Sequence, residues 1–237
     1  NEVEISPQGL DKRFTEEAAT FLQPVLEEAV NTVVLAPQPV PIELLNRVTA
    51  VWLLDTTVLR LPDELEEVWP GTGGRTTTNL QSSLKVEVGF DLKRGQLKGP
   101  FLLPGRRADL AGQLPAESFA TGSLRIADLG YFSLVEMAKL DQEGNFWLSR
   151  LRNDTLLATL DGKSLSLEEL AFTGTKANHR RLELEVLLGE QRLPARLLLE
   201  RVPSAVAAKR RAQVKNRGRK KGPTPSRKTL ALCEFTR

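Results

Sequence analysis

Two apolar stretches, VWLLDTTVLRLP (51–62) and SLRIADLGYF (123–132), decide the fold, because each predicts a buried strand that ends on an aspartate. A buried strand in a parallel or mixed sheet is a near-continuous hydrophobic run. Its exit lies at the edge where ligands bind in open α/β sheets. Asp55 and Asp128 are therefore candidates to share a divalent cation, which prefers oxygen ligands. The plain alternative is that each aspartate ends a strand or caps a helix, as Asp128 would for a helix near Tyr131.

Strands and helices alternate around these two runs. The first strand is predicted over 48–55, with Asp55-Thr56-Thr57 ending or interrupting it and VLRLP continuing it. Apolar residues at helical spacing predict a helix over 10–35 that begins near Thr15, because acids such as Glu16 and Glu17 favour the first turn. Further strands are predicted at 85–92, 97–105 and 145–152, and further helices at 108–115 and 131–140. This order predicts an α/β fold with a mixed sheet.

Changes in composition divide the chain into four parts. An N-terminal helical segment covers 1–41 and ends in a Pro-rich break. The core covers 42–153, and a β-rich part with turn signals at Asp161-Gly162 and Gly189-Glu190 covers 154–203. A basic connector, 204–237, follows it.

Cysteine and histidine are too scarce for several kinds of chemistry. The 237 residues include one cysteine, Cys233, and one histidine, His179. One cysteine cannot form a disulfide within the chain, which fits a reducing compartment. A zinc site of Cys and His ligands is excluded as well. We expect His179, in the polar stretch TGTKANHRR, to be an exposed loop residue rather than a catalytic base.

Positive charge is concentrated in one segment. Ten Lys or Arg residues and no acid lie between Lys209 and Lys228, and the rest of the chain has 23 basic and 30 acidic residues. Such a run either is a solvated linker or binds an anionic partner. Ten cations would neutralise several phosphates of a nucleic acid. Because no aromatic residue is interleaved with them, contacts to the phosphate backbone are favoured over base stacking. The charge of this segment alone is also compatible with a nuclear-localisation signal.

Three stretches of the core occur in a characteristic order: VWLLDTTVLRLP, KVEVGFDLKRGQ and RIADLGYFSLVEMAKLDQEGNFWLSRLR. Together they resemble the catalytic core of bacterial insertion-sequence transposases of the DDE type, the group with a long β insertion. The resemblance implies a ribonuclease-H-like mixed sheet with flanking helices, and the β-rich part 154–203 as an insertion. It also implies metal-dependent cleavage and strand transfer of transposon ends, with Mg²⁺ or Mn²⁺ as cofactor. The first-strand aspartate of that family matches Asp55, and the aspartate of Asp-Leu-Gly-Tyr-Phe matches Asp128.

The chain departs from that family at two points. The family often has Asp-Asp-Thr at the first site, whereas this chain has Asp55-Thr56-Thr57. Its third catalytic acid is a glutamate in a Tyr…Arg…Glu…Lys signature on a helix after the insertion, and the sequence contains no such spacing. Glu234 does not fit the signature, so no residue is assigned as the third acid. We expect the chain to be truncated before that helix and inactive by itself, because a two-metal site would lack one carboxylate.

The resemblance implies double-stranded DNA as the partner, in the form of transposon terminal repeats and target. It also implies a homodimer on paired ends, and a location in the bacterial cytoplasm near the nucleoid.

Tyr131 either positions a phosphate or packs in the core, and packing is favoured. The predicted DNA-contacting cations are two arginines on the 145–152 strand and eight residues of the basic segment: Arg150, Arg152, Lys209, Arg210, Arg211, Lys215, Arg217, Arg219, Lys220 and Lys221. The two arginines share one face of that strand by its period of two, where ordinary edge charges are the alternative.

Two other functional classes remain compatible with the sequence. One is a non-catalytic DNA-binding remnant of a transposase. The other is a ribonuclease-H-like nuclease that hydrolyses without strand transfer. We predict a DNA transposase core with Asp55 and Asp128 as the catalytic and metal-binding residues.

Overall fold

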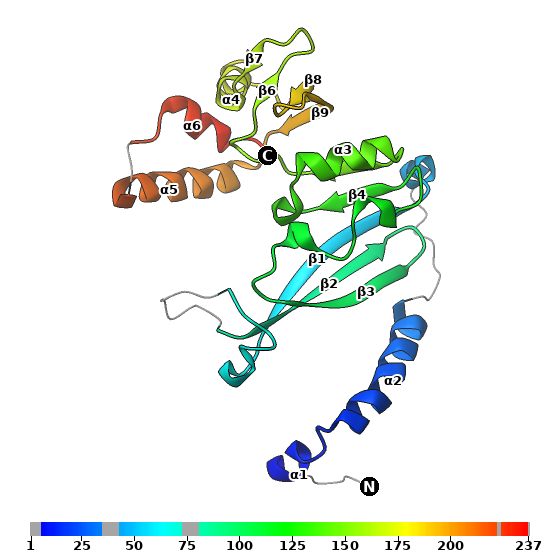
Figure 1. Ribbon diagram of the computed structural model, residues 1–237. Helices are drawn as coiled ribbons and strands as arrows, with labels where there is room; N and C mark the ends of the chain where they lie inside the picture. Colours follow the sequence, from blue (N-terminus) through cyan, green and yellow to red (C-terminus); the bar gives the residue numbers. More distant parts are fainter. Residues whose placement is uncertain (1–5, 35–42, 73–80, 222–223, 237) are drawn as a thin grey trace. The chain divides into compact units, whose positions relative to one another are not determined.

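The computed structural model describes residues 6–34, 43–72, 81–221 and 224–236 (Figure 1). The chain forms two compact units. The first comprises Asn1–Ala127 and Leu140–Leu148, and the second comprises Asp128–Lys139 and Ser149–Arg237. The boundaries predicted at residues 41, 153 and 203 remain predictions.

A mixed five-stranded sheet is the centre of the first unit. Its strands have the order β3-β2-β1-β4-β5, in which β1 is antiparallel to β2 and parallel to β4, and β2 is antiparallel to β3. The bounds are β1 Val51–Arg60, β2 Ser83–Asp91, β3 Gln96–Pro104, β4 Leu124–Ala127 and β5 Phe146–Ser149. The predicted α/β fold with a mixed sheet is confirmed.

The first strand is not interrupted at Asp55-Thr56-Thr57. β1 continues through Asp55 to Arg60, because β2 pairs with it along this whole stretch, from Trp52↔Asp91 to Arg60↔Ser83. Its parallel partner β4 pairs only as far as Leu54↔Ala127. Asp55 therefore does not end a strand. It is the first residue of β1 beyond the parallel ladder.

Helices of the first unit agree with the sequence in part. After α1 (Pro7–Asp11), α2 covers Glu16–Val34 with Pro24 inside it, and Thr15 Oγ1 accepts the Ala18 N–H at 3.3 Å. The predicted start near Thr15 is thus confirmed. The Pro-rich break near residue 41 lies outside the described residues. The remaining elements are short 3₁₀ turns: η1 Glu43–Arg47, η2 Asp63–Leu65, η3 Asp109–Ala111 and η4 Ala116–Ser118. The prediction of a helix over 108–115 is therefore wrong, except for the short turn η3.

A four-stranded antiparallel sheet, in the order β7-β6-β8-β9, belongs to the second unit. Its strands are β6 Leu157–Ala158, β7 Ser164–Leu165, β8 Arg181–Leu188 and β9 Leu193–Glu200. The β8–β9 hairpin turns at Gly189, whose φ of +66° suits glycine, so the predicted turn there is confirmed. The 3₁₀ turn η5 (Leu129–Tyr131) and most of α3 (Leu134–Gln142) also belong to the second unit. Because α3 begins at Leu134, the helix predicted over 131–140 begins three residues later than expected.

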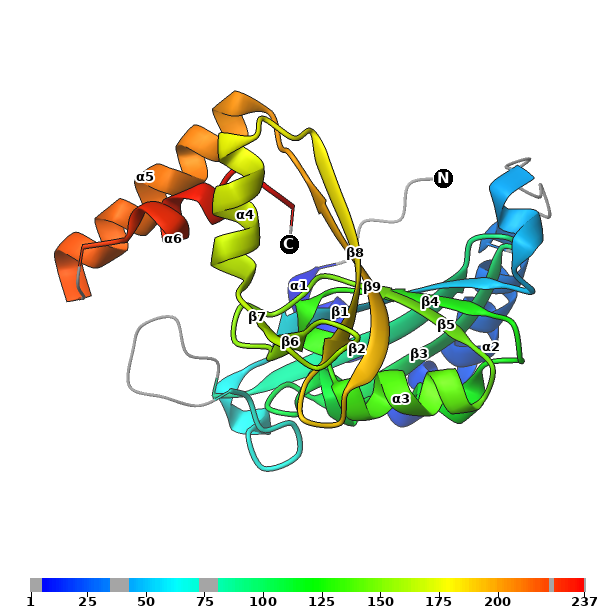
Figure 2. The same ribbon diagram turned by 90° about the horizontal axis from the view of Figure 1, so that it is seen from above.

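Three helices complete the second unit. α4 covers Leu167–Lys176, α5 covers Ser204–Lys221 and α6 covers Arg227–Leu232, and Figure 2 shows α4 and α6 side by side. The sequence predicted a β-rich part over 154–203 with no helix in it, so α4 is a correction. It likewise predicted a connector where α5 lies. Within the part of the chain that is described, no helix is long and apolar enough to cross a membrane.

Candidate metal and nucleic-acid sites

Asp55 lies on the exposed part of β1. The strand is buried at Val51, Trp52 and Leu54, and it becomes exposed from Asp55 onwards except for half-buried Thr56. One Asp55 carboxylate oxygen, Oδ1, accepts the N–H of Thr56 at 2.9 Å. The carboxylate thus remains accessible to solvent while its backbone is held by the β1–β2 ladder.

Asp128 comes directly after β4. Its backbone is extended, with φ −79° and ψ −174°, and its Oδ1 accepts the Gly130 N–H at 2.7 Å as the cap of η5. The alternative that this aspartate caps a helical turn is therefore realised, for η5 rather than for α3. The side chain is exposed, so capping leaves its other oxygen accessible.

The parallel ladder relates the two positions through their neighbours. Leu54 and Ala127 are partners in that ladder, and they directly precede Asp55 and Asp128 in the chain. The described residues contain no group of three or more His, Cys, Asp or Glu side chains that is arranged to hold a metal ion. The assignment of Asp55 and Asp128 as metal ligands remains a prediction.

A second polar cluster, which the sequence did not predict, lies on the opposite face of β1 and β2. The Lys85 ammonium lies 2.6 Å from Asp109 Oδ1 and also donates to the Arg107 carbonyl, while the Thr56 hydroxyl donates to Asp109 Oδ1 at 3.1 Å. Glu87, fully buried, accepts the Gln113 N–H at 2.6 Å. Thr56, where the transposase family often has an acid, thus contributes to a structural contact with the loop after β3.

The arginines predicted on the last core strand lie after that strand. β5 ends at Ser149, so the expectation that Arg150 and Arg152 share one strand face was wrong. Both side chains are exposed. Arg152 pairs with Asp154 (Nη2–Oδ2 2.9 Å), and this hydrogen bond lowers the pKa of Asp154.

The basic segment is a helix for most of its length, which a charge run alone did not predict. Lys209 and Lys215 are exposed on α5. Arg210 and Arg211 instead contact the C-terminal segment: Arg210 Nη1 donates to the Phe235 carbonyl at 2.8 Å, and Arg211 Nη1 lies 3.1 Å from Glu234 Oε1. Four further predicted cations lie on α5, but their side chains are outside the described set: Arg217, Arg219, Lys220 and Lys221.

The structure also shows the environment of three residues to which the sequence assigned no catalytic role. Tyr131 is 4% exposed, which agrees with packing in the core. His179 is exposed in the loop after α4, as predicted. Glu234 bonds to cations and to the Thr175 hydroxyl (Oγ1–Oε2 3.3 Å), so its carboxylate is occupied within the fold.

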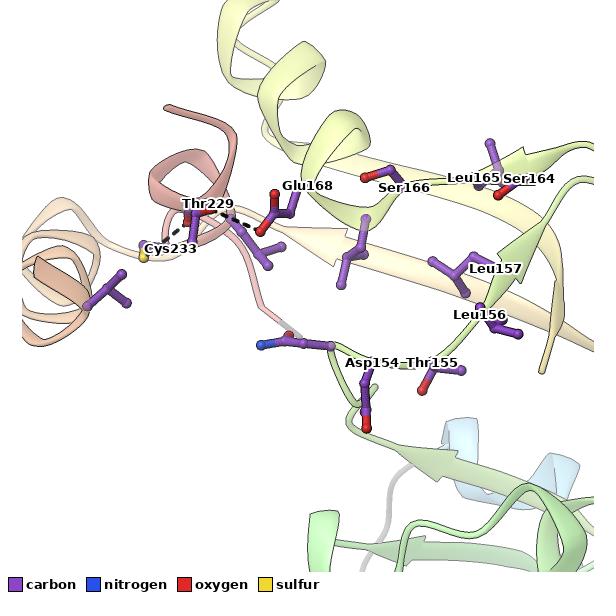
Figure 3. A pocket seen from close by; sticks show the side chains of 14 residues that line it. Asp154, Thr155, Leu156, Leu157, Ser164, Leu165, Ser166, Glu168, Thr229 and Cys233 are labelled. Atoms are coloured by element: carbon purple, nitrogen blue, oxygen red, sulfur yellow. Dashed lines mark hydrogen bonds between the residues drawn. The ribbon is translucent and has the colours of Figure 1, made fainter. Parts of the chain in front are cut away.

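One cavity of about 410 Å³ lies in the second unit, between the 153–157 loop, β7, α4, α5 and α6 (Figure 3). The charged side chains that line it are Asp154 and Glu168, and Glu168 accepts the Thr229 hydroxyl at 3.1 Å. Because its charged lining is acidic, this cavity does not suit a phosphate group.

Known insertion-sequence transposases are similar to this chain. The transposase of IS231F from Bacillus thuringiensis subsp. israelensis is 32% identical over 152 residues, which cover 64% of the chain and 31% of that relative. The transposase of IS231C from Bacillus thuringiensis subsp. berliner is 27% identical over 245 residues, covering 96% of the chain and 51% of the relative. The transposase of IS1151 from Clostridium perfringens is 24% identical over 155 residues.

The chain thus has homologues among transposases of the IS231 kind, and it spans between about a third and a half of their length. No protein-family model matches the chain. The similarity supports the resemblance found in the sequence at the level of transposases.

Proposed function

We propose that this chain contains a ribonuclease-H-like DNA transposase core region, in which Asp55 and Asp128 bind Mg²⁺ or Mn²⁺. The observation that carries the proposal is the similarity to insertion-sequence transposases, which covers 96% of the chain in the IS231C relative. The mixed sheet, with β1 antiparallel to β2 and parallel to β4, is compatible with the core that the resemblance implies.

The two aspartates suit a hard divalent cation. Leu53 and Ile126 are partners in the parallel ladder, and Asp55 and Asp128 each lie two residues further along the chain. Both carboxylates are exposed, and carboxylate oxygens are the donors that Mg²⁺ prefers. Bound there, the metal would activate an attacking hydroxyl or water and stabilise the charge that develops on phosphorus oxygens.

The chain's own residues would hold these carboxylates in place. β2 fixes the backbone of Asp55 through the antiparallel ladder, and the Gly130 N–H orients Asp128. No residue of this chain is assigned as the third acid. Exposed cations of the predicted DNA-contacting set, such as Lys209 and Lys215, would hold the DNA backbone without reading sequence.

The proposal is tested with Asp55→Asn and Asp128→Asn in the full-length protein. Each variant should lose strand cleavage while DNA binding stays nearly unchanged, because an amide cannot replace the carboxylate charge at the metal. Asp63→Asn, at an exposed aspartate of the unit that contains Asp55, is the matched control and should cleave normally. Wild-type cleavage by either catalytic variant would refute the assignment.

Two further outcomes separate the alternatives. Salt-sensitive DNA binding by the wild-type protein without metal-dependent cleavage would favour a non-catalytic DNA-binding protein. Cleaved but never joined DNA would favour a nuclease of the same fold class. Joined products support a transposase.

A further inference from the structure

The two sides of α5 differ in their surroundings. Ala207, Arg210, Arg211, Val214 and Gly218 are buried or half-buried, and their spacing of three or four residues forms one stripe along the helix. The other described side chains of α5 are exposed. Arg210 and Arg211 therefore lie on the packed side, although the sequence groups them with the other cations of the basic segment.

The two arginines of the packed side hold the C-terminal segment 233–236. Arg210 donates to the main-chain carbonyl of Phe235, whose side chain is 0% exposed. Arg211 pairs with Glu234 at 3.1 Å, and Arg201 approaches the other oxygen of the same carboxylate at 3.6 Å. Cations on two sides thus neutralise a carboxylate that is only a quarter exposed.

The segment that these arginines hold extends the sheet of the second unit. The Thr236 N–H donates to the Glu200 carbonyl at 2.7 Å, and the Val202 N–H donates to the Glu234 carbonyl at 2.8 Å. An arginine that turned towards a phosphate would leave a partly buried carboxylate or carbonyl without its donor, which costs free energy. Arg210 and Arg211 are therefore poorly placed to contact DNA.

The exposed side of α5 presents different groups. Lys209, Gln213 and Asn216 follow one another at intervals of four and three residues, so they form a second stripe, here called the outer stripe. Lys215 is exposed at its flank. Within the described residues, neither lysine makes a hydrogen bond or ion pair, and α5 contains no acidic residue. Lysine and side-chain amides are common donors to phosphate oxygens.

We propose that α5 binds the DNA phosphate backbone through the outer stripe and Lys215, while Arg210 and Arg211 are positioning residues that fix α5 on the C-terminal segment. This inference rests on the proposed function, and it adds Gln213 and Asn216 to the predicted interface while it removes two arginines from direct contact. Lys228, the last cation of the basic segment, pairs with Glu169 and is likewise not assigned to the interface.

The experiment measures binding of a labelled DNA duplex to the whole chain by fluorescence anisotropy over a series of salt concentrations. The plot of log K against log salt has a negative slope, and each phosphate contact through a cation adds about 0.9 to its magnitude. Lys209→Gln with Lys215→Gln should therefore reduce the magnitude of the slope by about 1.8. Gln213→Ala with Asn216→Ala should weaken binding and leave the slope unchanged, because neutral groups release no counterions.

Two controls separate contact from positioning. Arg180→Gln with Arg192→Gln removes two exposed cations of the same unit outside α5 and should leave the slope unchanged. Arg211→Gln should also leave the slope nearly unchanged, but amide hydrogen exchange at 234–236 and 200–202 should become faster, since the segment loses its anchor.

The outcomes distinguish this inference from the proposed function. A reduced slope in Arg210→Gln or Arg211→Gln, with an unchanged slope in the lysine pair, would overturn the division of α5 and leave DNA binding intact. An equal loss in the Arg180/Arg192 control would also overturn it. Wild-type chain that binds no duplex at low salt would remove both this inference and the DNA-binding part of the proposed function.

Discussion

The two faces of the β1–β2 strand pair differ in whether their charged residues are buried and have partners within the fold. On one face Lys85 and Glu87 are buried, and their partners from the loop after β3 are Asp109 and the Gln113 N–H. On the other face Asp55 is exposed opposite the half-buried Val88. The same ladder thus holds charges with structural partners on one side and an accessible carboxylate on the other. Burial and partners, rather than the number of acids, separate a candidate ligand from a structural charge.

The largest effect that tests this comparison is expected at the buried ion pair. Lys85→Met should lower the free energy of unfolding of the first unit by about 2–3 kcal/mol, since Asp109 and the Arg107 carbonyl lose their donor but Asp109 stays partly exposed. All three tryptophans, Trp52, Trp69 and Trp147, belong to this unit, so their fluorescence in a urea titration reports on it alone.

The control for that variant is Arg60→Met, at the exposed end of β1. A surface substitution of this kind changes stability by less than about 0.5 kcal/mol. Equal urea midpoints for Lys85→Met and the wild-type chain would show that the Lys85–Asp109 pair is not a structural contact, and the comparison of the two faces would fail.

A somewhat smaller effect is expected where the loop after β3 covers Glu87. A Cβ at Gly112 would collide with Glu87 Oε1 and lie 2.7 Å from its Cδ. Gly112→Ala should therefore destabilise the first unit by about 1–2 kcal/mol, because the buried carboxylate must move away from the Gln113 N–H. Glu87→Ala in the same chain should relieve the collision, so the double variant should be more stable than the sum of the two single effects implies.

Hydrophobic runs and cap signals predicted much of the backbone. The two apolar runs became β1 and β4, and Thr15-Glu16-Glu17 marks the start of α2. A cap signal was also present for α4: Ser166 accepts the Glu169 N–H at 3.3 Å, in the Ser-x-x-Glu spacing of a capping box. The helix was not predicted because the short stretches around it indicated β structure. The segment of α5 was interpreted by its charge as a connector, although it is rich in Ala, Lys, Arg and Gln, which are good helix formers.

The sequence could not predict which face of β2 is buried. Its alternation of charged and apolar residues suggests that Val86, Val88 and Phe90 face the core. In the structure these three are half-buried, while Lys85, Glu87 and Asp91 are buried. For Lys85 and Glu87 the reversal depends on Asp109 and Gln113, which lie more than twenty residues further along the chain, so no local pattern contains it. Similarly, the pairing of Arg211 with Glu234 separates the cations of α5 through a contact that spacing does not show.

The smallest effect on stability is expected at Asp55 itself, and it is the sharpest test of the comparison. Asp55→Asn in this chain should change the free energy of unfolding by less than about 0.5 kcal/mol, because the side chain is exposed and an amide oxygen can still accept the Thr56 N–H. A urea titration followed by tryptophan fluorescence measures this change. A loss as large as that of Lys85→Met would make Asp55 a structural charge like those on the opposite face. An unchanged midpoint, together with lost cleavage in the full-length protein, is the combination expected of a carboxylate whose main partner is a bound metal ion rather than the fold.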